Sequence, residues 1–188
     1  MGRWQPDARG RLQEAALELY GERGFEPTAV ADIAERAGLT ERTFFRYFAD
    51  KREVLFSGSE MLVELFANSV ANAPDLLTPL DMVGEALNDV AELFAERLEH
   101  SRARQAVIDA NPSLRERELI KLATLGQAVA DALRARGVGD SDAILTAEAG
   151  ITVFKVAFGI WVAGPDDGDL AAVMRRTMAD LKAVAAGG

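Results

Sequence analysis

The chain contains no cysteine and only one histidine among its 188 residues. Without cysteine there can be no disulfide framework, no thiolate zinc site and no cysteine nucleophile, and one histidine is too few for most histidine-based catalytic or metal sites. The sequence also lacks a glycine-rich phosphate loop, a His-Glu-x-x-His pair and a Gly-x-Ser-x-Gly turn. These absences predict a protein that is not an enzyme and uses no metal or cofactor.

Long apolar runs are missing as well. Residues Met1 to Pro6 lack the apolar segment of a secretory signal, and no stretch approaches the roughly 18 uninterrupted apolar residues of a membrane span. A composition of 49% hydrophobic and 27% charged residues is ordinary for a soluble globular protein of one or two domains. We therefore expect a cytoplasmic protein with no membrane partner.

Positive charge is scarce overall, since the net charge is -9, but it is unevenly distributed. Residues 3–52 carry nine basic and nine acidic groups, whereas residues 53–188 carry 12 basic and 21 acidic groups. Within the neutral segment, residues 36–52 hold five basic and two acidic groups. A DNA-binding surface needs local rather than overall positive charge, so the acidic total does not exclude nucleic acid.

Apolar residues recur at the three-and-four spacing of helices, and no convincing strand pattern is present, so the sequence predicts an all-α fold. Thr28, Thr40 and Asp50 are expected N-caps, and Gly24 and Gly38 are expected helix ends. We expect about nine helices, covering residues 7–23, 28–37, 40–48, 51–70, 78–99, 102–109, 112–136, 141–163 and 169–185.

The helices expected at 28–37 and 40–48 are short and are joined by Ala37-Gly38-Leu39-Thr40, which predicts a helix-turn-helix. In that motif the second helix enters the DNA major groove and the first lies across the backbone. The most specific residues of the segment are Ile33, Ala34, Ala37, Gly38, Leu39, Thr40, Thr43, Phe44, Phe45, Tyr47, Phe48 and Lys51. With these residues at this spacing, the stretch from Thr28 to Phe56 resembles the DNA-binding domain of TetR-family transcriptional regulators.

The resemblance is close over roughly a quarter of the chain, and the remaining helices match only in number, length and order. It implies a homodimer that binds a palindromic operator, usually represses a nearby gene and releases DNA when a small molecule binds. It also implies a three-helix helix-turn-helix domain in residues 1–52 and a larger ligand-binding and dimerisation domain in residues 53–188. The DNA-binding residues that it implies are Thr28, Thr40, Glu41, Arg42, Thr43, Phe45, Arg46, Tyr47 and Lys51.

Within this set, the resemblance assigns phosphate contacts to Thr28, Tyr47 and Lys51 and places the others toward bases and backbone. Arg42 stands where glycine is frequent and suits a bidentate contact with guanine. Phe45 replaces a common tyrosine, which leaves its ring for a thymine methyl group. Each residue also has a simpler interpretation, because threonines cap helices, tyrosines pack, and arginines are often solvated. Phe44 and Phe48 are expected in the core, and Arg3, Arg9 and Arg11 form either a minor-groove arm or a solvated tail.

The helix expected at 141–163 is apolar on almost every side, so it must be buried on two sides. By the family pattern, it and the last helix form a four-helix bundle across a two-fold axis, and the alternative is a core within one chain. The predicted dimer interface comprises Ile144, Ala147, Ile151, Phe154, Phe158, Trp161, Leu170, Val173, Met174 and Leu181.

A ligand cavity in the second domain would be mostly apolar, which suits a hydrophobic or amphipathic effector. The sequence does not distinguish residues that line a pocket from residues that fill the core, so it does not identify the ligand-binding residues. It also leaves open the effector, the operator, the target genes and whether the protein represses or activates transcription. The alternative function is a helical protein-interaction adaptor that binds no specific DNA. Arg42, Arg46 and Lys51 argue against it.

Overall fold

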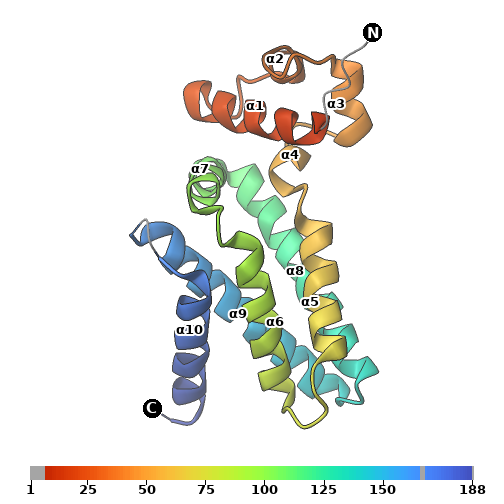
Figure 1. The fold of residues 1–188 in the computed structure, drawn as a ribbon, viewed down its shortest axis with the longest axis vertical. Coiled ribbons are helices and arrows are strands. Elements are labelled where there is room, and N and C mark those ends of the chain that lie inside the picture. The colour runs from red at the N-terminus through yellow and green to blue at the C-terminus, as the bar shows by residue number, and fades with distance from the viewer. Residues whose placement is uncertain (1–6, 166–167, 188) are drawn as a thin grey trace. The chain divides into compact units, whose positions relative to one another are not determined.

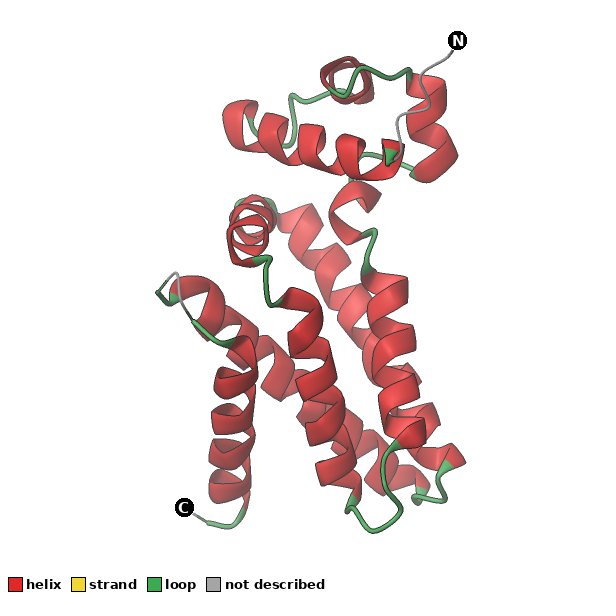
Figure 2. Cartoon of the chain, viewed as in Figure 1, coloured by secondary structure: helices red, strands yellow, loops and turns green. Residues whose placement is uncertain are grey.

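The computed structural model describes residues 7–165 and 168–187, and within these ranges all regular structure is helical (Figure 2). The helices are α1 (Ala8–Arg23), α2 (Val30–Arg36), α3 (Glu41–Tyr47), α4 (Glu53–Phe56), α5 (Ser59–Asn72), α6 (Pro79–Phe94), α7 (Leu98–Asp109), α8 (Pro112–Ala135), α9 (Asp140–Ala163) and α10 (Leu170–Ala185). The all-α prediction is confirmed. The predicted helix 51–70 is interrupted between α4 and α5, at Ser57 and Gly58, and the predicted helix 78–99 ends at Phe94.

Most of the expected helix ends are confirmed by hydrogen bonds. The hydroxyl oxygen of Thr40 accepts from the amide of Thr43, at 3.2 Å, and starts α3. Gly24 and Gly38 have φ angles of 88° and 66°, a left-handed conformation that favours glycine. The expectation for Thr28 is wrong: the N-cap of α2 is Ala29, and the buried Thr28 hydroxyl instead donates to the Gly24 carbonyl, at 2.7 Å.

The chain forms two compact units, which are described separately. The first contains the residues up to 58 together with residues 103–118, and the second contains residues 59–102 and those from 119 onward. Helices α7 and α8 therefore each contribute residues to both units. A domain boundary at residue 52 stays a prediction.

The first unit has its own apolar core, in which α1 packs against α2 and α3 (Figure 1). Phe44 and Phe48 are buried in this core, as the sequence predicts. Residues of α7 and α8 complete it, since Val107, Ile108 and Leu114 belong to the same cluster. Helix α3, the predicted recognition helix, therefore packs on an apolar core that includes side chains of α7 and α8, which are distant in sequence.

In the second unit α5 lies beside α6, and α9 packs against both α6 and α10 (Figure 1). Gly150 of α9 faces Val83 of α6 at a point where the two helices approach closely. By length and composition alone, α9 and the segment Glu53–Asn72 would be long and apolar enough to cross a membrane. The apolar content of α9 has a different explanation, because its buried side chains form much of the core of this unit.

Candidate nucleic-acid interface

Helix α3 has a buried face and an exposed face. Phe44 is fully buried, whereas Arg42, Phe45 and Arg46 are exposed. These three residues lie on the face of the helix that points away from the core. Phe45 is 55% exposed, so much of its ring is accessible to a partner. The helix therefore presents cationic and aromatic groups together on one face.

At the N-terminal end of α3, Thr40 and Glu41 are exposed and Thr43 is half-buried. The two threonine hydroxyls lie 3.1 Å apart, within hydrogen-bond distance. Thr40 therefore caps the helix, as its simpler interpretation holds, while its outer surface stays accessible. Contact of these three residues with DNA remains a prediction.

The two arginines of α3 differ in their surroundings. The Arg46 guanidinium donates to the Tyr47 hydroxyl at 3.0 Å and lies 4.8 Å from the centre of its ring. This contact orders both side chains on the surface. Within the part of the chain that the structure describes, no hydrogen bond or ion pair involves the guanidinium of Arg42, so all of its donors face solvent.

Other basic residues near α3 are neutralised within the chain. Arg36 pairs with Glu18 at 3.0 Å and with Glu22 at 2.9 Å, and this hydrogen bonding holds the pKa of the Glu22 carboxyl below its usual value. Arg52 likewise pairs with Asp50 at 2.6 Å. The positive charge that residues 36–52 can offer to a phosphate backbone is therefore concentrated on α3.

Lys51 occupies a different place from the one that the resemblance suggests. Its ammonium group donates to the carbonyls of Phe25, Glu26 and Thr28 at 2.9, 2.9 and 3.1 Å. It also lies 4.5 Å from the centre of the Phe25 ring. An ammonium group has three donors, so in this structure all three hold the loop that precedes α2. Phosphate contacts by Lys51 and by the buried Thr28 stay predictions.

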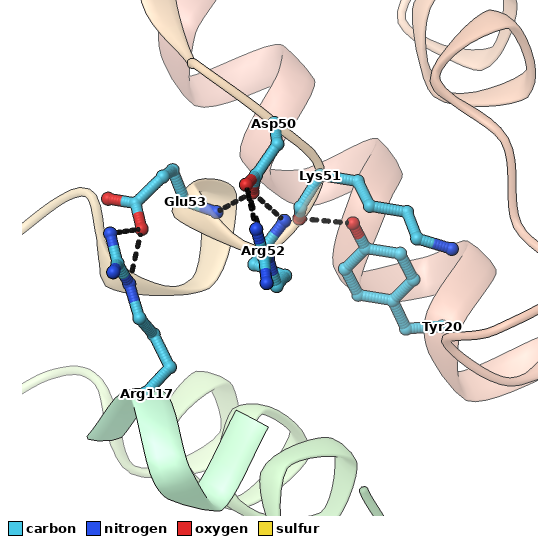
Figure 3. Close-up of polar contacts among 6 residues, drawn as sticks. All are labelled: Tyr20, Asp50, Lys51, Arg52, Glu53 and Arg117. Atoms are coloured by element: carbon cyan, nitrogen blue, oxygen red, sulfur yellow. Dashed lines mark hydrogen bonds and ion pairs between the residues drawn. The ribbon is translucent and has the colours of Figure 1, made fainter. Parts of the chain in front are cut away.

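The backbone around Lys51 is also fixed (Figure 3). The Tyr20 hydroxyl donates to the Lys51 carbonyl at 2.6 Å, and burial, with a smaller effect from the charge of Asp50, raises the pKa of Tyr20 well above its usual value. The Asp50 carboxylate accepts from the amides of Arg52 and Glu53 at 2.8 and 3.1 Å. Asp50 therefore orders the chain just before α4, but the expectation that it is the N-cap is wrong, because the N-cap of α4 is Arg52.

Two arginines that the sequence did not single out tie α4 to α7 and α8 within the first unit. Arg117 donates to Glu53 at 2.8 Å (Figure 3). The partly buried Arg104 donates to the Leu55 carbonyl at 2.8 Å and pairs with Glu118 at 3.1 Å. Burial lowers the pKa of Arg104, and Glu118 opposes this change. No local pattern distinguishes these charges from solvated ones, because their partners are distant in sequence.

The arginines before and within α1 do not all fit a minor-groove arm. Arg9 donates to the Ser57 carbonyl and Arg11 to the Ala37 carbonyl, so both guanidinium groups bind their own unit. Arg3 lies outside the described residues. The described part of the chain therefore supports neither an arm nor a freely solvated tail for Arg9 and Arg11.

The residues predicted for the dimer interface fall into three groups. Ile144 is exposed, and Phe158, Val173 and Leu181 are partly buried. The other six pack in the core of their own chain, and their part in a dimer interface stays a prediction: Ala147, Ile151, Phe154, Trp161, Leu170 and Met174. The sequence predicts that α9 is buried on two sides, but it does not reveal which elements cover those sides. In the structure, α6 and α10 of the same chain cover much of α9. The apolar side chains that remain exposed on α9 include Leu145, Val156 and Ile160.

Comparison with known proteins identifies this arrangement. Residues 12–57 match the family model described as bacterial regulatory proteins of the tetR family, and residues 77–186 match the one described as the MftR C-terminal domain. The chain belongs to the TetR family. It is therefore a DNA-binding transcriptional regulator, and the family consists of regulators rather than enzymes. The adaptor alternative is set aside.

Individual relatives agree with this assignment. The chain is 25% identical to the mycofactocin biosynthesis transcriptional regulator MftR of Mycobacterium tuberculosis over 169 residues, which are 86% of this chain and 81% of that protein. It is 37% identical to the regulator TcmR of Streptomyces glaucescens over 82 residues, which are 44% of this chain and only 36% of TcmR. The structure of FadR from Bacillus subtilis shares the fold, with a TM-score of 0.60, 20% identity, and coverage of 92% of this chain and 96% of that one.

Proposed function

We propose that this regulator is a cytoplasmic homodimeric repressor that binds a palindromic operator and leaves it when a small hydrophobic or amphipathic molecule binds the second unit. It has no enzymatic activity of its own in this proposal. The observation that carries the proposal is the two-sided helix α3, whose buried face anchors it and whose exposed face offers Arg42, Phe45, Arg46 and Tyr47 together.

The exposed groups of α3 suit distinct parts of a DNA duplex. Arg42 has free donors for the O6 and N7 atoms of guanine, and Phe45 offers an apolar ring to a thymine methyl group. Tyr47 and Arg46, held together at 3.0 Å, suit a phosphate oxygen beside the groove. Thr40, Glu41 and Thr43 lie at the end of α3 that enters the groove first in helix-turn-helix proteins.

An amphipathic effector class has support from the comparisons. The Bacillus subtilis FadR structure is a complex with stearoyl-CoA, a molecule with a long apolar chain and a charged head. At 20% identity this similarity concerns the fold, so the effector of the present chain is proposed only by class. Effector binding would favour an arrangement in which two copies of α3 no longer match successive major grooves, about 34 Å apart.

For the dimer, we propose the exposed side of α9, where Leu145, Val156 and Ile160 lie unburied. We expect Val156→Glu to convert a dimer into a monomer in sedimentation-velocity measurements, because a carboxylate in an apolar interface loses its hydration. Leu76→Glu is the matched control, since Leu76 is 99% exposed and lies outside α9. A dimer that survives Val156→Glu would place the interface elsewhere.

The experiment that tests the function is selection of bound sequences from a random duplex library at two salt concentrations. We expect a palindrome with two half-sites, since a two-fold dimer presents two copies of α3. Tyr47→Phe should weaken binding without changing the recovered motif, because a phosphate contact carries no base information. Arg97→Ala, which removes an exposed cation in the second unit, is the control. Recovery of no motif, with weak binding that salt abolishes, would contradict the proposal.

With the operator known, a reporter gene placed behind it separates repression from activation. A repressor lowers reporter expression, and the effector restores it. Expression that rises when the regulator is added would overturn the repressor assignment while leaving the DNA-binding assignment intact.

A further inference from the structure

A cleft in the second unit lies between α6 and α10 and has a volume of about 300 Å³. This volume is at the lower end of the range for small-molecule sites, about 300–1,000 Å³. Its apolar lining includes Leu80 and Leu87 of α6 and Met174 and Met178 of α10. Methionine side chains adapt their shape easily, so this wall suits a compact apolar body.

A glycine keeps the cleft open. Gly84 lies in the middle of α6 and lines the cleft, and a Cβ atom added there would have no neighbour within 4 Å. Glycine in a helix interior costs about 0.5–1 kcal/mol relative to alanine. Close packing does not require a glycine at this position, and its missing side chain leaves space in the cleft.

Two residues of α6 that line the same cleft carry acceptors for which the described part of the chain supplies no donor. The Oδ1 atom of Asn88 is buried and has no hydrogen-bond partner. One turn earlier on the same face of α6, Glu85 is exposed and forms no ion pair with any described residue. An unpaired buried acceptor costs about 1–3 kcal/mol. Of the two acceptors, the exposed Glu85 carboxylate is the one that a ligand in the cleft can reach.

The other charged groups of the cleft already have partners. Asp81 accepts from Lys182 at 2.7 Å and from the Thr78 hydroxyl at 2.6 Å, and this hydrogen bonding, led by Lys182, holds the pKa of Asp81 below its usual value. Arg175 lies 3.8 Å from Asp169. Within the described part of the chain, Glu85 is therefore the acidic group of the cleft without a cationic partner.

We propose that this cleft binds a compact apolar amine, whose ammonium group meets the carboxylate of Glu85. The apolar body lies against Met174 and Met178 and over Gly84. The proposal concerns binding and stands whether or not the amine releases DNA.

The test uses the full chain labelled with ¹³C at its methionine methyl groups. The sequence has five methionines, of which Met174 and Met178 line the cleft while Met61 lies on α5. The probes are 4-phenylbutylamine, 4-phenylbutanol and 4-phenylbutyrate, which share an apolar body and differ in head group. We expect the amine to shift the Met174 and Met178 resonances saturably, with at least tenfold higher affinity than the alcohol, and to leave Met61 unchanged.

Variants then separate the polar and steric parts of the proposal. Glu85→Gln should weaken the amine about tenfold and leave the alcohol unchanged, whereas Glu92→Gln, on the same helix and outside the cleft lining, should change neither. Gly84→Leu should block both, because its side chain fills the cleft. Preference for the butyrate, shifts at Met61 alone, or an amine affinity that Glu85→Gln leaves unaltered would each overturn the proposal.

DNA release is measured separately. Amine binding that leaves the protein on its operator would assign the cleft a role other than induction, while the methionine shifts would still establish the site. Failure of operator binding in the absence of any amine would count against the proposed function alone.

Discussion

Replacement of Lys51 by methionine keeps the aliphatic stem and removes the ammonium group. A hydrogen bond to a charged group contributes about 1.5–3 kcal/mol. Three bonds from one ammonium are not additive, and Glu26 is exposed, so we expect a total loss of about 2–3 kcal/mol in the free energy of unfolding. At about 2–4 °C per kcal/mol for a chain of this size, the midpoint of thermal unfolding should fall by about 5–10 °C.

The assay is thermal unfolding followed by circular dichroism, together with hydrogen exchange of the amides in residues 25–37. Lys51→Arg tests the geometry, because a planar guanidinium cannot point three donors at three carbonyls as an ammonium does. We expect both variants to lose stability and both to lose exchange protection in the loop before α2. If both unfold within 1 °C of the unaltered chain while DNA binding weakens, Lys51 acts through phosphate alone and the structural role is refuted.

Three further predictions concern the packing and charge of the fold. Gly150→Ala should destabilise the second unit by about 1–3 kcal/mol in urea unfolding, because the added methyl group overlaps a valine of α6; Gly159→Ala, with no neighbour within 4 Å, should not. The raised pKa of Tyr20 in the folded protein means that its protonated hydroxyl stabilises the fold fully below the unfolded-state pKa of about 10, and that this stability declines as the pH rises above 10. Tyr20→Phe has no group that titrates there, so its free energy of unfolding should fall less between pH 9 and pH 11 than that of the unaltered chain. Unfolding at pH 9 and pH 11 measures this, with Tyr47→Phe as the control, and an unchanged pH dependence in Tyr20→Phe would contradict it. Glu118→Gln should cost about 2 kcal/mol in urea, since it leaves a partly buried arginine without its counter-charge; a neutral effect would mean that water solvates that arginine.

Much of the first unit is predictable from sequence because its signals are local. The cap at Thr40, the turn at Gly38 and the burial of Phe44 and Phe48 each follow from spacing within a few residues. The exposed face of α3 follows in turn, since the remaining positions of a helix whose other side is buried must face outward.

What the sequence does not reveal depends on partners that are far away in the chain. The three acceptors of Lys51 lie 23 to 26 residues before it, and they come together only because the α1–α2 loop returns to the start of α4. The same reason applies to α9. Its periodicity predicts two buried sides, but only the tertiary structure shows that Phe154 and Trp161 are covered by their own chain.

The claim that α3 reads DNA is tested most directly at single base pairs. The measurement is the affinity of the unaltered regulator and of Arg42→Ala for the selected operator and for operators with one base pair replaced at a time. We predict that Arg42→Ala loses about 1–3 kcal/mol of discrimination at one G·C pair in each half-site and keeps it at the other positions. Equal weakening on every operator would show that Arg42 supplies charge without reading sequence, and the account of α3 as the base-reading helix would be contradicted.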